Sequence, residues 1–139
     1  MWFTREQFQL CNELRQWGLS PRFEPGDLVA RGFADLGFEE FQVLPGPKLL
    51  SLTAGTLTPL PAEHAGHFFW IPSVDESVSL IEKIGAVICS CAREEAREWV
   101  LALKIRDSVE ELRARNVHDV VLKALLVAYR DAYRSKLGE

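Results

Sequence analysis

The prolines are distributed unevenly along the chain. Of the seven in 139 residues, six fall between positions 21 and 61, together with five of the nine glycines. Proline removes a backbone donor and both residues favour turns, so a long helix cannot pass through this stretch. Short apolar runs separate the turn residues, which predicts antiparallel strands at 28–31, 41–44, 48–53 and 56–60. Residues 19–67 are therefore expected to form a small β-meander.

A helix is expected before the meander, from Thr4 to Trp17. Thr4 is a favourable N-cap, Gln7 stands where a capping box needs it, and Gly18 supplies a stop. Between these signals, apolar residues recur at helical spacing. The pattern predicts an amphipathic helix that packs on a sheet.

A second capped helix is expected after the meander. Phe68–Ile71 reads as a short strand ended by proline, and Ser73 with Glu76 forms a capping box for a helix that ends at Gly85. Strand patterns follow at 86–92 and 97–105. These elements begin the second half of the chain.

The last part of the chain contains one ambiguous segment. Residues 107–115 could form an edge strand or the start of one long helix, and strand followed by helix is favoured. Asn116 is a credible N-cap for a closing helix through Tyr133. The expected fold class is α+β: an N-terminal helix and small antiparallel β-meander (1–67) packed with a helix–strand–strand–(strand)–helix unit (68–139), within one compact domain.

The apolar runs of the chain bear on membrane association, and its cysteines bear on the cellular compartment. The longest apolar run, 117–133, is interrupted by charged residues, and the N-terminus lacks a basic head followed by an apolar stretch. Three cysteines do not suggest a disulfide framework. A cytoplasmic protein without a membrane partner is expected.

The second half of the chain resembles a group of small phage- and prophage-encoded proteins of unknown function. The shared features are a Trp-x-Pro lead-in at 70–72, a short helix ending at Gly85 and a strand pair centred on Trp99. An alanine- and leucine-rich closing helix, with Ala124-Leu125-Leu126 and Ala128-Tyr129, completes the pattern. The resemblance implies a fold and an origin, and it carries no reaction.

The same half is also topologically similar to double-stranded RNA-binding domains. Such domains carry a lysine cluster at the start of their last helix, where it meets phosphates. Here that position is Asn116-Val117-His118-Asp119, with one acid and no lysine. The RNA-binding interpretation is therefore disfavoured.

Two histidines and two cysteines form the sharpest candidate metal set. His64 and His67 share a loop, and Cys89 and Cys91 share a strand. Cys-x-Cys is an unusual zinc spacing and buried thiols are common, so no metal is expected at these residues. Gly-x-Ser-x-Gly, P-loop and dinucleotide motifs are also missing from the sequence. We expect no catalytic residue and no cofactor, and an enzyme is the least favoured of three functions.

The closing helix carries the candidate binding surface. The chain has a net charge of −4, but residues 113–139 hold six Lys and Arg against three Asp and Glu. Helical spacing places three basic residues in one sector, with two tyrosines beside them, and a tryptophan near a proline adds a possible contact anchor. These binding candidates are Lys123, Tyr129, Arg130, Tyr133, Arg134 and Trp70. The favoured function is a non-enzymatic accessory protein acting on a protein partner or by self-association, and the alternative is nucleic-acid binding by the basic side of this helix.

Overall fold

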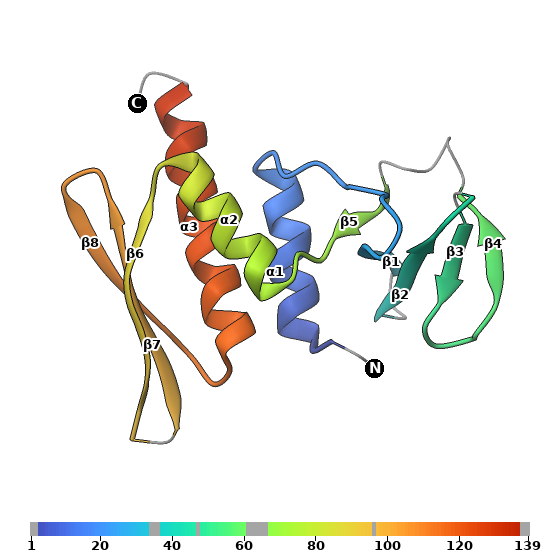
Figure 1. Ribbon diagram of the computed structural model, residues 1–139, viewed down its shortest axis with the longest axis horizontal. Helices are drawn as coiled ribbons and strands as arrows, with labels where there is room; N and C mark the ends of the chain where they lie inside the picture. Colours follow the sequence, from blue (N-terminus) through green and yellow to red (C-terminus); the bar gives the residue numbers. More distant parts are fainter. Residues whose placement is uncertain (1–2, 34–36, 47, 61–66, 96, 137–139) are drawn as a thin grey trace. The chain divides into compact units, whose positions relative to one another are not determined.

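The computed structural model describes residues 3–33, 37–46, 48–60, 67–95 and 97–136. Within these ranges the chain forms three helices and two antiparallel sheets, which confirms the α+β class (Figure 1). Backbone contacts divide it into two compact units, an N-terminal unit, Met1–Pro72, and a C-terminal unit, Ser73–Glu139.

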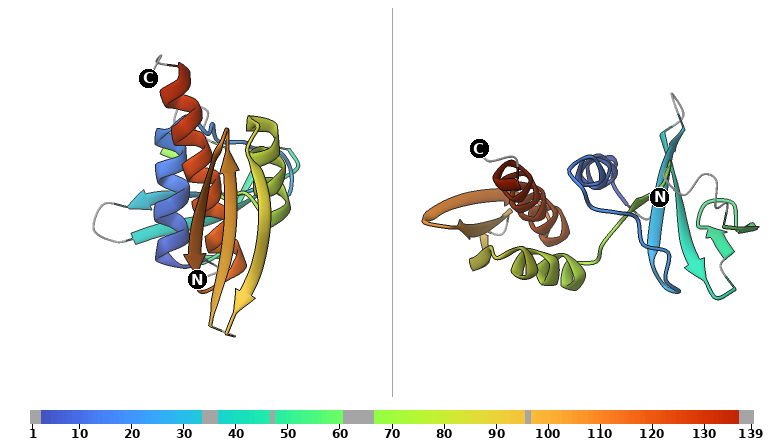
Figure 2. Two further views of the ribbon diagram at one scale, coloured as in Figure 1. Left: turned by 90° about the vertical axis from the view of Figure 1, so that its left-hand side faces the viewer. Right: turned by 90° about the horizontal axis from the view of Figure 1, so that it is seen from above.

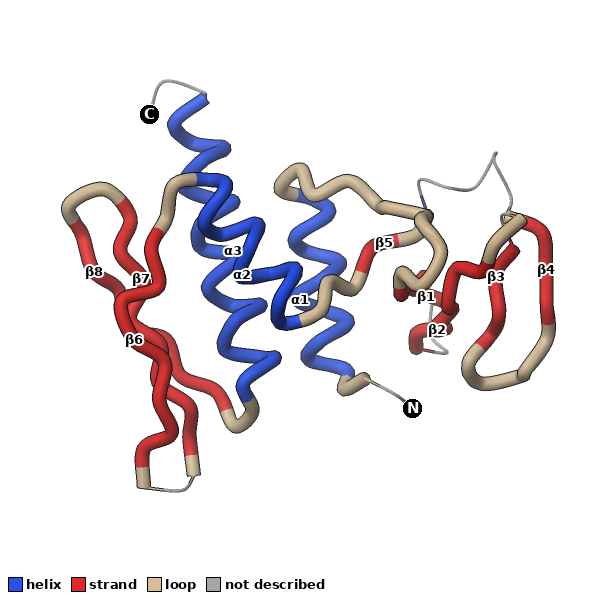
Figure 3. Tube along the Cα trace, in the orientation of Figure 1, coloured by secondary structure: helices blue, strands red, loops and turns tan. Residues whose placement is uncertain are grey.

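The N-terminal unit contains one helix and a five-stranded sheet of order β4-β3-β2-β1-β5. Its elements are α1 (Arg5–Gln16), β1 (Leu28–Phe33), β2 (Gly37–Leu44), β3 (Lys48–Ser51), β4 (Leu57–Pro59) and β5 (Phe69–Trp70). The expected helix and meander are both present, since β1 to β4 pair antiparallel in sequence order (Figure 3). The fifth strand, β5, pairs with β1, so residues 69–70 belong to this sheet and not with the helix that follows.

The sheet of the N-terminal unit is covered on both faces. Val29 pairs with Phe41 and Ala30 pairs with Glu40, so the two pairs face opposite ways. On one face Val29 and Phe41 belong to a buried cluster completed by Val43, Leu49 and Phe68. On the other face Phe8 of α1 stacks on Phe38 at 4.9 Å between ring centroids. This two-sided burial gives a short meander its own core.

The C-terminal unit has the order helix, three strands, helix. Its elements are α2 (Val74–Ile84), β6 (Val87–Glu94), β7 (Glu98–Ile105), β8 (Ser108–Ala114) and α3 (Val117–Lys136). The three strands form an antiparallel sheet of order β6-β7-β8. Segment 108–114 is therefore a strand, as favoured, and β6 runs two residues past its expected end at Ala92.

Both helices of the C-terminal unit lie on one side of its sheet (Figure 2). Leu101 and Leu103 on β7 are fully buried, and α3 contributes Leu122 and Leu125 to the same core. On the outer face, Arg113 pairs with glutamates from all three strands at 2.7 to 3.7 Å: Glu94, Glu98 and Glu111. One side of the sheet therefore holds the core, and the other side is open in the described chain.

Gly85 ends α2 in the left-handed conformation, with φ of 100°. A Cβ added there would meet nothing within 4 Å, so a substitution costs only backbone strain. We expect Gly85→Ala to lower the free energy of unfolding by about 1 kcal/mol, measured by urea denaturation. Ser79→Ala, on an exposed position of the same helix, should leave stability within about 0.5 kcal/mol. Equal stability of the two variants would contradict the strain argument.

Candidate functional site

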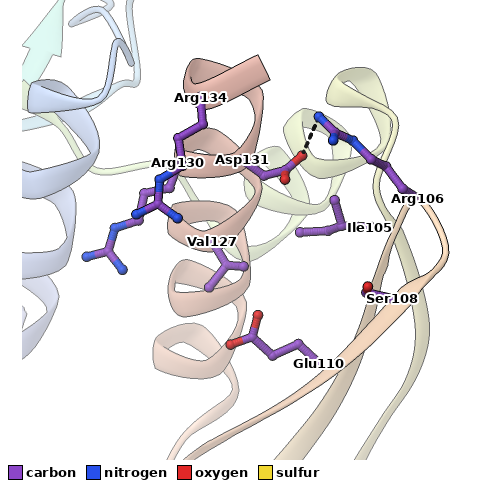
Figure 4. A pocket seen from close by; sticks show the side chains of 8 residues that line it. All are labelled: Ile105, Arg106, Ser108, Glu110, Val127, Arg130, Asp131 and Arg134. Atoms are coloured by element: carbon purple, nitrogen blue, oxygen red, sulfur yellow. Dashed lines mark ion pairs between the residues drawn. The ribbon is translucent and has the colours of Figure 1, made fainter. Parts of the chain in front are cut away.

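A groove of about 390 Å³ lies between the end of α3 and the turn that joins β7 to β8 (Figure 4). Its volume is within the usual range for ligand sites. The lining residues are Ile105, Arg106, Ser108, Glu110, Val127, Arg130, Asp131 and Arg134. All of them belong to the C-terminal unit.

The groove exists because α3 is longer than the core beneath it. The helix has 20 residues, about 30 Å, but its buried residues all fall between Asp119 and Ala128. Beyond Ala128 the helix extends past the sheet's apolar centre, while the β7–β8 turn continues alongside it. Ile105 and Val127, both half-buried, are the apolar residues of the lining.

Arg106 reaches across the groove from one wall to the other. It occupies the turn with φ of 56°, a conformation that few residues other than glycine adopt. Its Nη2 lies 3.5 Å from Oδ2 of Asp131 on the helix. Because 3.5 Å is long for a charge-assisted bond and both side chains are partly exposed, this pair is weak and open to competition.

Arginines dominate the rim of the groove. Arg130 and Arg134 are four residues apart on α3, and Figure 4 shows their guanidinium groups on the flank of the helix that faces away from Arg106. In the described chain Arg134 makes no ion pair. The lining carries three cations, Arg106, Arg130 and Arg134, and two anions, Glu110 and Asp131.

The structure brings together only part of the basic stripe predicted from the sequence. Arg130 and Arg134 line the groove, whereas Lys123 donates its Nζ to the Arg113 carbonyl at 3.0 Å, at the end of β8. Tyr129 is half-buried, and desolvation raises the pKa of its phenol; Tyr133 is 43% exposed. Neither tyrosine lines the groove.

Trp70 does not have the partial exposure expected of a contact anchor. Its side chain is only 5% exposed, and the Arg22 guanidinium covers the ring at 4.4 Å from the centroid. The neighbouring Phe68 and Phe69 are each 1% exposed. The three aromatics are core residues of the N-terminal unit.

Metal binding gains no support from the described residues. His64 lies outside them, and His67, Cys89 and Cys91 are exposed. Among the residues described, no three or more His, Cys, Asp or Glu side chains are grouped closely enough to hold a metal ion. Over the same residues, none of the helices is both long and apolar enough to cross a membrane.

Of the eight lining residues, sequence reasoning named only Arg130 and Arg134 and missed the other six. Arg106 sits in the β7–β8 turn and Ser108 is the first residue of β8, where a charged and a hydroxyl residue carry no periodic signal. Comparison with protein-family models, with curated proteins and with solved structures finds no match for the chain.

Proposed function

We propose that the chain is a non-enzymatic accessory protein that acts through protein–protein contacts, and that its groove binds an acidic segment of a partner protein. The observation that carries this proposal is the meeting of Arg106, from the β7–β8 turn, with Arg130 and Arg134 on α3 around one groove.

The chemistry of the groove suits a carboxylate beside an apolar group. A guanidinium offers a planar fork of donors that matches both oxygens of a carboxylate. Arg106 can provide such a fork from the β7–β8 turn, and Ile105 and Val127 offer apolar contact beside it. The exposed Arg134 side chain, whose guanidinium lies on the far flank of α3 in Figure 4, would reach the same ligand by a change of rotamer. An acidic residue next to a leucine or valine would therefore fit.

A phosphate backbone suits this surface less well. Glu110 and Asp131 lie within the groove and would repel a continuous polyanion. In a double-stranded RNA-binding domain, the start of the last helix meets phosphates. Here that position carries an acid, Asp119, in the first turn of α3.

A phage or prophage origin is part of the same proposal. The helix–three-strand–helix order of the C-terminal unit and the Trp70–Pro72 lead-in support it. Inspection of the neighbouring genes tests it: phage structural or regulatory genes on both sides are expected, and a housekeeping operon would contradict it.

Binding of acidic peptides tests the groove. Fluorescein-labelled peptides that combine Asp or Glu with leucine should bind, as followed by fluorescence anisotropy. The double variant Arg106→Gln, Arg134→Gln should weaken binding by about tenfold or more, because each charge-assisted bond contributes about 1.5–3 kcal/mol. Arg97→Gln, an exposed arginine in the β6–β7 turn, is the matched control and should not change affinity.

The nucleic-acid alternative predicts a different pattern. The excess of basic residues in 113–139 favours it. Binding to an RNA or DNA oligonucleotide that falls steeply with added salt, together with no binding of acidic peptides, would replace the protein-contact proposal. Loss of binding in Arg97→Gln equal to that in the double variant would show that the groove is not the site.

A further inference from the structure

Glu110 is a charged residue on the core side of the C-terminal sheet. It pairs with Leu103 of β7, which is fully buried, so both side chains point to the side of the sheet where the helices lie. Its neighbour Val109 points to the open face and is 62% exposed. The usual pattern of a sheet with one solvated face is apolar inside and polar outside. At these two positions β8 has the reverse.

The Glu110 carboxylate has no partner within the described part of the chain, where it makes neither an ion pair nor a side-chain hydrogen bond. The other acid of the lining, Asp131, pairs with Arg106 at 3.5 Å. These two charges neutralise each other, and the two α3 arginines of the lining point to the far flank of the helix (Figure 4). Glu110 therefore leaves a negative charge at its own end of the groove.

We propose that Glu110 binds a basic side chain of the partner segment, so that the groove selects an acid, an apolar residue and a base in that order. This selection rests on the proposed function, the binding of an acidic segment, and adds a base to it. Figure 4 shows the order along the groove. Arg106 and Asp131 lie at one end, Glu110 lies at the other, and Ile105 and Val127 lie between them.

The spacing of the motif follows from the geometry of an extended peptide. Alternate side chains of an extended chain point to the same side, and a step of two residues advances about 7 Å. Glu110 lies two residues beyond Ser108 on β8, and Arg106 lies two residues before it, in the turn. Two such steps of a peptide match this span, with the acid and the base at its ends. The expected motif is acid-x-leucine-x-base.

An inward-pointing charge on an edge strand also protects that strand from pairing with another chain, and β8 is an edge strand. Protection depends on the presence of a charge and not on its sign, so a lysine provides it equally well. Binding of a base depends on the sign. Glu110→Lys therefore separates the two roles in a chain whose edge stays protected.

Two fluorescein-labelled peptides test the selection: Glu-Ser-Leu-Ser-Lys and Glu-Ser-Leu-Ser-Glu, each made in both sequence directions. By fluorescence anisotropy the parent chain should bind the lysine peptide about tenfold more tightly, because the glutamate peptide sets like charges against each other. Glu110→Lys should reverse this preference, and Glu110→Gln should reduce it to less than about threefold. Glu82→Lys, the same charge change on an exposed residue of α2 outside the groove, should keep the preference of the parent.

The results distinguish failure of the base site from failure of the groove. If the parent binds both peptides equally and Glu110→Lys changes neither affinity, an acidic segment binds but Glu110 selects no base, and the inference is overturned. A lysine preference that survives Glu110→Lys also overturns it, because the base then contacts another acid. So does an equal reversal by Glu82→Lys, because the peptide then responds only to net charge. If no peptide binds the parent or any variant, both the base site and the acidic-segment groove are wrong.

Discussion

Phe8→Ala is expected to destabilise the N-terminal unit by about 3–5 kcal/mol. Phe8 is fully buried, stacks on Phe38 at 4.9 Å, and meets Phe3 and Phe69 edge-on at 6.0 and 6.4 Å. Truncation removes a whole ring from this aromatic cluster and leaves a cavity between α1 and the sheet, because β2 and β5 cannot move inward without breaking their pairing with β1.

Native-state hydrogen exchange is the suitable measurement, because it reports each unit separately. Backbone amides of β1 and β2 should lose protection in Phe8→Ala. Phe8→Leu, which retains much of the buried volume, should cost about 1–1.5 kcal/mol. A loss below about 1 kcal/mol for Phe8→Ala would mean that α1 is not part of this core.

Local signals in the sequence were enough to predict most of the elements. The capping boxes at Thr4 and Ser73 are both formed, each with its two reciprocal hydrogen bonds. Asn116 likewise accepts from the Asp119 amide at 2.8 Å. Such signals depend on residues three or four apart, so they can be read without knowing the tertiary structure.

The strand β8 was ambiguous for a physical reason. Its inward positions Ser108 and Glu110 face the groove and not the apolar core, so only Leu112 and Ala114 alternate as a buried strand should. Half of the pattern was therefore missing from the sequence. Ser108 and Glu110, the polar residues that interrupt the alternating pattern of the strand, also line the groove.

The exposure expected of Trp70 as a contact anchor was wrong because the sequence does not show how many faces of a sheet are covered. Successive residues in a strand point to opposite faces, so a sheet covered on only one face would leave part of this aromatic run exposed. In the structure Phe69 meets Phe8 on the α1 side, and Phe68 packs with Phe41 on the other side. A sheet covered twice can bury all three.

Only the part of the candidate site that lies on α3 could be predicted from the sequence. Periodicity on one helix brings Arg130 and Arg134 together, since that relation is local. Arg106 is 24 residues from Arg130 along the chain, and their proximity depends on how α3 lies against the β7–β8 hairpin. The sequence pattern specifies which face of α3 is buried, but it does not specify at which residue the helix extends beyond the edge of the sheet.

Asp27→Ala is expected to destabilise the N-terminal unit by about 2–3 kcal/mol. The Asp27 carboxylate is 6% exposed and accepts three bonds: from Arg22 Nε at 2.9 Å, from Arg22 Nη2 at 2.8 Å, and from the Glu24 amide at 2.9 Å. The same Arg22 covers the Trp70 ring on β5. Asp27 therefore fixes the segment before β1 against the last strand of the sheet.

The expected loss for Asp27→Ala is below that for a fully buried ion pair because the Arg22 side chain is 41% exposed and also lies 3.6 Å from Glu24 Oε2, so water and that carboxylate can solvate the guanidinium. Asp27→Asn retains an acceptor for the Glu24 amide and should cost about half as much. Urea denaturation followed by tryptophan fluorescence measures both variants, since release of Arg22 also changes the surroundings of Trp70. If Asp27→Ala and Asp27→Asn destabilise equally, the amide bond contributes nothing and the ion pair alone holds the segment. If neither lowers stability by more than about 0.5 kcal/mol, the segment is held by its backbone bonds to β2, such as that from the Val43 amide to the Asp27 carbonyl at 2.9 Å.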